Sequence, residues 1–407
     1  MAERRPRLQV ALRYATEALA DRSPHDEGTE LLALLRVLSN ARLDFTLYRP
    51  RTLTIPPLPS AERRGIGGLV PQLRLPRSGR RMAAMVDPPV PTVSVCIPTY
   101  KRPVELRRAV ASVFAQTYTD WELLISDDED PPGETWGYLC ELPKCDPRVR
   151  VMRNPGPHGQ VPNMNWTLVH ARGTWIKPLH HDDVLRPECL EALLVSTRGL
   201  PSVVIVSCLF DYYFLGRRVR NWRRRGAAPV ELVPQRYVHL RMYLQDCSVG
   251  VPTQVMVHRK AIEHGALFED VPGVVSGVDA LWSCSVSRHG DLLLVNKALV
   301  EHHQDAGTIT ASLKPGQIEA EYQTLLSREL DCIDPALKPP PLAVALGMAT
   351  CLRAISYLKS GRIRDTLRLL RQVRHLYAWL LVARWVLAQI FPLSFHAAPT
   401  IPPTQKG

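Results

Sequence analysis

The sequence predicts an α/β fold, with a parallel sheet and packed helices in the middle of the chain. From residue 91 onward, short apolar runs of strand length alternate with segments of helical spacing. Several of these apolar runs end on acidic or polar residues. Strand–helix–strand units of this kind form parallel sheets whose strand ends open onto a crevice, the usual ligand position. The chain has 407 residues and 45% hydrophobic content, enough for such a core.

The first predicted unit runs from residue 92 to residue 130. "TVSVCIP" (92–98) is a short apolar run ended by proline, "VELRRAVASVFAQ" (104–116) has helical spacing, and "WELLISDDED" (121–130) is a second apolar run that stops on acids. We interpret these segments as strand, helix and strand. Asp127 and Asp128 are therefore expected at the edge of the sheet, where a ligand would bind.

A second unit repeats the pattern. "RVRVMRN" (148–154) is a third strand candidate, the second half of the following loop (155–173) has helical spacing, and "TWIKPL" (174–179) is a fourth strand. The fourth strand is followed by four polar residues in succession: His180, His181, Asp182 and Asp183.

The two acidic pairs are expected to face one crevice in a basic chain of net charge +12. Carboxylates there would repel each other and a phosphate unless a divalent cation lay between them, and Mg²⁺ binds a few carboxylates together with substrate phosphate oxygens. This predicts Asp182 as a metal ligand bridging to a diphosphate. Two alternatives stay open: Asp182 and Asp183 can cap the helix that "VLRPECLEALL" predicts, or Asp182 can form a zinc site with His180 and His181.

Charge and cysteine usage limit the function classes. A sequence pI near 9.4 favours polyanionic partners. Nucleic acid is not expected, because the arginines are dispersed and no aromatic-studded basic strand or recognition helix is present. The nine cysteines follow no C-x-x-C or zinc-finger spacing, which favours a reduced compartment and inert roles for Cys140 and Cys145. The N-terminus lacks the apolar core of a secretory signal, so a cytoplasmic location is expected.

The segments "VSVCIPTYKRPVELRRAVASVFAQTYTDWELLISDDED" and "NMNWTLVHARGTWIKPLHHDDVLRPECLEAL" resemble successive motifs of the family-2 inverting glycosyltransferases with the GT-A fold. The resemblance continues in family order through "SGVDALW" and "VEHHQDAGTITAS" and covers residues 91–312. It implies a nucleoside-diphosphate sugar donor, a divalent cation (Mn²⁺ or Mg²⁺), and a single displacement that inverts the anomeric centre.

The resemblance assigns donor-site residues by position. The loop after the first strand, which wraps the nucleotide in this family, corresponds to Pro98, Thr99, Tyr100 and Arg102. The acidic pair that contacts the base or ribose corresponds to Asp127 and Asp128, and the residues that close the donor site to Asn163 and Asn165.

His180, His181 and Asp182 occupy the family's Asp-x-Asp motif, in which the last Asp holds the metal on the diphosphate. We expect Asp182, with Asp183, as the metal ligands, and the two histidines at the donor. His180 replaces the first Asp of the motif and changes how the ribose is held, because imidazole is not a carboxylate.

Two further catalytic residues follow from the resemblance. Asp279 in "SGVDALW", followed by Trp282, matches the helical acid that serves as general base, although Val278 stands where the family often has Glu. Such a base must lie within hydrogen-bond reach of the acceptor, and burial would raise its pKa towards a useful value. In the stretch from His302 to Gln304, His303 is expected to stabilise the leaving diphosphate.

The ends of the chain differ from the middle. We expect residues 1–90 to hold a helix near 29–38 followed by a Pro- and Arg-rich linker, residues 91–312 to form the catalytic domain, and residues 313–407 to be helical and basic. An apolar helical stripe in the last region comprises Ile363, Leu367, Leu370 and Val373, and a basic stripe comprises Arg364, Arg368, Arg371 and His375.

The apolar run at 376–391 contains Arg384 and is shorter than the ~20 apolar residues of a spanning helix. It is expected to lie in a membrane interface, with Trp379 and Trp385 at the boundary. The alternative is a helical hairpin packed on the catalytic domain.

The expected function is therefore a metal-dependent inverting glycosyltransferase at the cytoplasmic face of a membrane. It would transfer sugar to a hydroxyl of a glycan or lipid-linked acceptor in cell-envelope polysaccharide or glycolipid biosynthesis. The alternative is a catalytically inactive relative that binds nucleotide sugars or acts as a scaffold, because its altered metal motif no longer supports transfer.

Overall fold

The structure is a computed structural model that describes residues 90–383, apart from residues 215, 220–228, 248, 305–314, 360–362, 374 and 376. The helix and linker predicted in residues 1–90 lie outside the described residues, as do Arg384 and Trp385.

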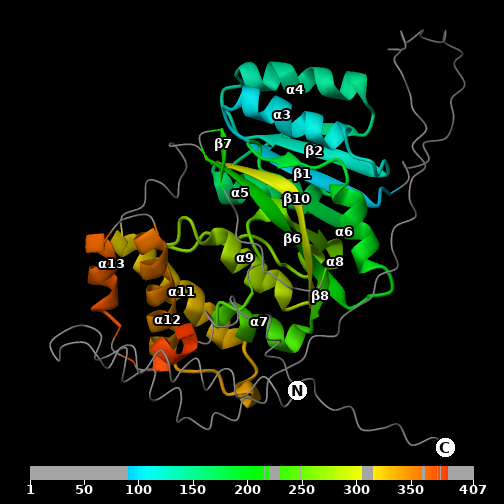
Figure 1. Cartoon of the computed structure of the whole chain (residues 1–407). Helices are drawn as coiled ribbons and strands as arrows, with labels where there is room; N and C mark the ends of the chain where they lie inside the picture. Colours follow the sequence, from blue (N-terminus) through cyan, green and yellow to red (C-terminus); the bar gives the residue numbers. More distant parts are fainter. Residues whose placement is uncertain are drawn as a thin grey trace, which may run out of the picture.

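One mixed sheet organises the described residues (Figure 1). Its main path has the strand order β3-β2-β1-β4-β9-β6-β10-β5, and β7 and β8 pair with β6 and β10. The strands are β1 (Val93–Thr99), β2 (Trp121–Asp127), β3 (Val149–Arg153), β4 (Trp175–Pro178), β5 (Val184–Leu185), β6 (Val203–Phe214), β7 (Arg217–Val219), β8 (Val230–Val233), β9 (Val255–His258) and β10 (Asp291–Gln304). The four predicted strands are β1 to β4, and all their mutual pairings are parallel, as expected.

Helices cover both faces of this sheet. Apolar side chains of α3 (Pro103–Phe114), α4 (Glu134–Cys145) and α6 (Cys189–Thr197) fill the core on one face. The other face is covered by α5 (Gln160–His170), α7 (Gln235–Tyr243), α8 (Arg259–Glu263) and α9 (Val278–Ser287). In the chain, the short 3₁₀ turn η1 (Pro252–Gln254) follows α7 and directly precedes β9. The three-layer α/β arrangement confirms the predicted fold class.

Local sequence explains most of the elements. In β1 and β2 nearly every residue is buried, which accounts for their mainly apolar composition. Pro103 occupies the first turn of α3, where its missing N–H costs nothing. Helix α4 was not predicted, because Gly137 and Pro143 interrupt its apolar spacing.

A group of C-terminal helices lies beside α7 and α9: α11 (Pro315–Cys332), α12 (Leu342–Lys359) and α13 (Ile363–Leu370), with the 3₁₀ turn η2 (Pro335–Leu337) after α11 (Figure 1). Buried Glu321 of α11 accepts hydrogen bonds from the backbone N–H groups of Val275 (2.8 Å) and Ser276 (3.2 Å). Because these residues immediately precede α9, α11 fixes the start of that helix.

The C-terminal segment combines a packed face with an exposed one. Ala378, Leu381 and Val382 are buried in one cluster with Met348 of α12, which agrees with the hairpin alternative for this part. By contrast, Ile363 is 61% and Leu367 40% exposed, and neighbouring arginines are exposed as well. Among the described helices, none combines the length and apolar character needed to cross a bilayer.

Candidate active site

The carboxyl ends of β1, β2 and β4 bring the predicted donor-site residues to one edge of the sheet. Asp128, just after β2, is buried and organises the next loop. Its carboxylate accepts hydrogen bonds from the side chain of Asn154 (2.7 Å) and the backbone N–H of Gly159 (2.7 Å), and lies 3.1 Å from Nδ1 of His158. Gly159 has φ +130, a conformation that favours glycine. Asp128 therefore holds the loop that leads into α5.

Beside this loop lies a group of buried polar atoms for which the described residues offer no hydrogen-bond partner. The amide nitrogen of Asn163 donates to the carbonyls of Thr99 (3.3 Å) and Ser126 (3.2 Å), so the strand ends meet at the start of α5. The atoms without a partner are Thr99 Oγ1, Ser126 Oγ, Asp127 Oδ2 and Asn163 Oδ1. Burial raises the pKa of Asp127. Buried polar atoms are normally satisfied, so this group is suited to a polar ligand.

The loop after β4 gathers potential metal ligands. One ligand atom each from His180, Asp182 and Asp183 lie within 4.8 Å of one another. His181 packs towards β1, with Nδ1 3.4 Å from the carbonyl of Pro98, and burial lowers its pKa. Nε2 of His180 is buried and has no partner among the described residues.

Asp183 is fully buried and differs from its neighbour Asp182. It accepts hydrogen bonds from Thr253 Oγ1 (2.6 Å) and the backbone N–H of His303 (2.9 Å), and Nδ1 of His302 lies 3.0 Å from its Oδ1. The helix-capping alternative for this pair was wrong, because β5 follows directly and α6 begins only at Cys189. Asp183 instead joins the loop to η1 and β10.

Asp279 lies in the first turn of α9 and is partly buried. Its Oδ1 is inaccessible and has no partner among the described residues. Burial raises its pKa, and the charges of His180 and His302 act in the opposite direction. Trp282, one turn later, donates from Nε1 to the carbonyl of Ala266 (3.0 Å) and stacks on Phe268, which fixes the orientation of α9.

His302 and His303 are adjacent on β10, so their side chains lie on opposite faces of the strand. His302 stacks on Tyr212 and pairs with Asp183. Burial acts to lower its pKa, but the hydrogen bond and charge of Asp183 outweigh this and the pKa is raised. His303 stacks on Tyr213 at a centroid distance of 4.7 Å, and its pKa is lowered, chiefly by burial.

A cavity of about 610 Å³ lies between β6, α7, α9 and α11. Asp279 and His302 line it, and most of the remaining lining is apolar: Phe210, Tyr212, Met242, Val249, Leu281, Leu325 and Leu326 are examples. Asp279 therefore lines a largely apolar cavity, and the charges of His180 and Asp183 from the loop after β4 act on it.

Three other predicted residues have local contacts of their own. Both groups of the Asn165 amide bond the backbone of Phe268, each at 2.9 Å, so this side chain ties α5 to the segment before α9. Tyr100 is 50% exposed, and Arg102 pairs with Glu105 of α3 at 3.3 Å.

Sequence reasoning missed several residues that support the site. Thr253 accepts the backbone N–H of His180 (3.1 Å) in addition to bonding Asp183, and its carbonyl accepts from the buried ammonium of Lys177. Arg108 of α3 donates to the carbonyl of Asp182 (2.7 Å). The available signal for Lys177 was a charged residue inside the predicted strand "TWIKPL", whereas Thr253 belongs to no motif.

The sheet, its helices and the polar edge after β1, β2 and β4 define a GT-A glycosyltransferase fold. The structure of residues 1–349 of Staphylococcus aureus TarS in complex with UDP-GlcNAc superposes with a TM-score of 0.50 at 15% identity, covering 63% of this chain and 70% of that one. The sequence model of glycosyl transferase family 2 matches residues 94–265. Residues 94–265 are therefore similar to the family-2 glycosyltransferases, and Asp279 and His303 lie beyond the matched residues.

Two named bacterial relatives align with part of this chain. The GalNAc(5)-diNAcBac-PP-undecaprenol beta-1,3-glucosyltransferase of Campylobacter jejuni is 31% identical over 126 residues, which are 30% of this chain and 40% of the relative. The Escherichia coli enzyme WfgD, a UDP-Glc:alpha-D-GlcNAc-diphosphoundecaprenol beta-1,3-glucosyltransferase, is 30% identical over 164 residues, 40% of this chain and 59% of the relative. The chain thus aligns with less than two thirds of each relative.

Proposed function

We propose that this chain is a metal-dependent inverting glycosyltransferase that transfers sugar from a nucleoside diphosphate to a hydroxyl acceptor. The observation that carries the proposal is the position of Asp279, a partly buried carboxylate that lines a largely apolar cavity. One of its oxygens has no partner among the described residues, and the charges of His180 and Asp183 act on it. A base between a diphosphate-binding edge and an acceptor cavity is the arrangement that a single displacement needs.

The buried polar atoms at Thr99, Ser126, Asp127 and Asn163 support nucleotide binding at the same edge, because a base or ribose supplies the missing hydrogen bonds. The TarS structure with this fold holds UDP-GlcNAc, and the two named relatives are glucosyltransferases. We therefore assign the donor to Thr99 and Asp127, together with the other predicted residues of the β1, β2 and α5 ends.

The residues after β4 fit a divalent cation. Asp182 belongs to the ligand group and is assigned as the main ligand. Nε2 of His180 has no partner among the described residues and is a second candidate ligand. Asp183 positions the loop through its hydrogen bonds with Thr253 and His302. When bound, Mn²⁺ or Mg²⁺ would supply positive charge against the diphosphate.

In the transfer step, Asp279 accepts the proton of the acceptor hydroxyl as that oxygen attacks the anomeric carbon from the side opposite the nucleotide. Because attack and departure occur on opposite faces, the configuration inverts. The carboxylate must be ionised to act, and its raised pKa makes it a stronger base than an exposed Asp. His303, whose lowered pKa favours the neutral ring, is assigned to donate a hydrogen bond to the departing diphosphate.

The acceptor is assigned to the cavity beside Asp279. Its apolar lining and the undecaprenol-linked substrates in the names of both relatives support a glycan carried on a lipid. The exposed Ile363 and Leu367 beside exposed Arg364 and Arg368 support peripheral contact of α13 with an anionic membrane, at the cytoplasmic face.

The test is a binding and turnover screen of the full chain against UDP-, GDP- and dTDP-sugars, with Mn²⁺, Mg²⁺ or chelator. We expect one donor to bind only with metal, Asp182→Ala to abolish that binding, and Asp279→Ala to bind donor without turnover. Asp270→Ala, which removes an exposed acid of the loop before α9, is the matched control. Donor binding without turnover in the unaltered chain, across acceptor preparations, would favour the inactive relative, and no binding of any donor would refute the proposal.

A further inference from the structure

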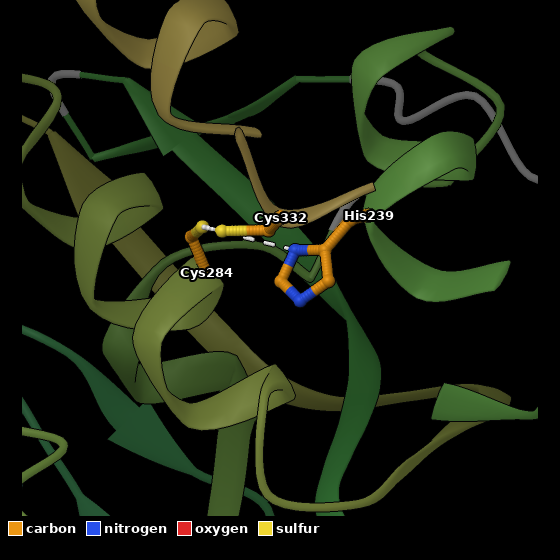
Figure 2. A group of neighbouring side chains, drawn as sticks. All are labelled: His239, Cys284 and Cys332. Carbon is orange, nitrogen blue, oxygen red and sulfur yellow. Dashed lines mark hydrogen bonds between the residues drawn. The ribbon is translucent and has the colours of Figure 1, made fainter. Parts of the chain in front are cut away.

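A second group of metal-ligating side chains lies where α7, α9 and α11 meet. His239 comes from α7, Cys284 from α9, and Cys332 is the last residue of α11 (Figure 2). One ligand atom from each residue lies within 4.8 Å of the others. All three are remote from one another in sequence. None has a role in the proposed transfer step, although Cys284 also lines the cavity assigned to the acceptor.

The spacing of these atoms fits one tetrahedral ion. The two sulfurs are 3.7 Å apart, and Sγ of Cys284 is 3.7 Å from Nδ1 of His239. Zinc bonds of ~2.3 Å to sulfur and ~2.0 Å to nitrogen, at tetrahedral angles, place the ligand atoms about 3.5–3.8 Å apart. Both cysteines are free thiols, and His239 and Cys284 are buried. The ligands therefore need little movement to bind zinc.

A candidate fourth ligand and a charge partner lie beside this group, although the carboxylate of Glu329 is not one of the atoms that all lie within 4.8 Å of one another. Glu329 lies almost one turn before Cys332 on α11, is buried, and has Oε2 2.8 Å from Nδ1 of His239. Two thiolates and a carboxylate on a dication leave one negative charge. Arg288 offsets this charge, because its Nη2 and Nε lie 2.9 and 3.2 Å from Sγ of Cys332. Hydrogen bonds of this kind to a metal-bound sulfur stabilise the ligand arrangement.

We propose that His239, Cys284 and Cys332 bind one Zn²⁺ ion that links α7, α9 and α11, and that Glu329 exchanges its hydrogen bond with His239 for the fourth position on the metal. Two thiolates and an imidazole select zinc over the hard cations assigned to the loop after β4. On binding, each thiol loses its proton to solvent, and His239 presents the Nδ1 lone pair to the metal while Nε2 carries the hydrogen. No oxidation change occurs. Because protein groups fill all four positions, the ion is structural.

The proposal is tested on the full chain by metal analysis and by cobalt substitution. We expect about one zinc per chain in protein purified without chelator. After removal of zinc, Co²⁺ should give a thiolate-to-cobalt charge-transfer band that saturates at one equivalent. Cys284→Ser and Cys332→Ser should each reduce that band and weaken zinc binding at least tenfold, whereas Cys145→Ser, at an exposed cysteine of α4, should leave both unchanged.

Two further variants distinguish this site from the proposed metal site after β4 and from a general loss of folding. Asp182→Ala should leave the charge-transfer band intact, because no thiolate is present at the loop after β4. Arg288→Gln should keep the band and weaken zinc binding about tenfold, the usual effect of removing an outer hydrogen bond. Absence of the band in the unaltered chain, zinc retention by both serine variants, or formation of a Cys284–Cys332 disulfide at the same rate with and without zinc would overturn the proposal.

Discussion

Nδ1 of His302 lies 3.0 Å from Oδ1 of Asp183, a residue 119 positions earlier in the chain. This pair joins the end of β10 to the loop that carries Asp182. The pKa of the buried Asp183 is lowered, since the hydrogen bond and charge of His302 outweigh the effect of burial, while that of His302 is raised. The geometry and both shifts indicate an ion pair in the folded chain.

This ion pair predicts a pH window for stability. The contribution of Asp183 is present above the ordinary Asp pKa of 3.8 and is lost as pH falls through its lowered folded value. The contribution of His302 is present below 6.5 and is lost as pH rises through its raised folded value. We expect Asp183→Asn to cost on the order of 3 kcal/mol between these limits. The measurement is urea unfolding in chelator, as a double-mutant cycle with His302→Gln at three pH values; a coupling energy independent of pH would contradict the ion pair.

Asp279→Asn is expected to separate activity from stability. Turnover should fall by about 10²–10⁴ if the carboxylate is the base, with donor affinity retained. Because the folded pKa is raised, ionisation destabilises the fold as pH rises above 3.8, so the variant should have a higher Tm than the parent chain at neutral pH and no advantage in acid. Calorimetry and single-turnover kinetics check both effects, with Asp270→Asn as control. A lower neutral Tm would show that the carboxylate stabilises its surroundings.

Asp127 and Asp128 are expected to act differently despite their adjacency. Asp128→Ala removes the acceptor of Asn154 and Gly159, so it should lower stability by about 1–3 kcal/mol and weaken donor binding through the loop. Asp127→Asn removes a buried carboxylate whose Oδ2 has no partner in the described residues, so it should weaken donor binding without loss of stability. Donor titration calorimetry and denaturant unfolding distinguish the two, and equal stability losses would refute the assignment.

Helix α13 is expected to contribute to membrane binding without contributing to folding. Leu367→Ser combined with Arg368→Glu should reduce sedimentation of the full chain with anionic vesicles several-fold, since an apolar anchor and about 1 kcal/mol of headgroup attraction per basic residue are lost. The Tm should not change, because both side chains are exposed. Arg172→Glu, an exposed basic residue before β4, is the charge-matched control. Identical sedimentation of all three chains would exclude α13 as the contact.

The predicted part of the fold rests on strong local signals. β1 and β2 are buried along their length, so each appears as a mainly apolar run that stops where the strand ends. The ends of parallel strands share an edge, which is why Asp127 and Asp182 could be placed on the same side of the sheet. Helix α4 buries little more than Leu139 and Leu142, and a helix with so narrow an apolar face leaves a weak periodic signal.

The remaining features depend on contacts that sequence spacing does not encode. Cys284 lies 45 residues from His239 and 48 from Cys332, so the group forms only when three helices pack. Asp182 and Asp183 look equivalent in the sequence, and only the positions of Thr253 and His302 show that Asp183 is buried in a network. The choice between His302 and His303 likewise depends on which side of β10 faces the cavity.

The contacts of buried Glu321 limit which segments related chains can exchange by recombination. The N–H groups of Val275 and Ser276, directly before α9, depend on a carboxylate supplied by α11. A recombination event that replaced the C-terminal helices alone would bring in a new α11 without the matching loop, and would displace the helix that carries Asp279. We therefore expect the loop before α9 to be inherited together with helix α11, whereas the helices that follow α11 can be exchanged separately.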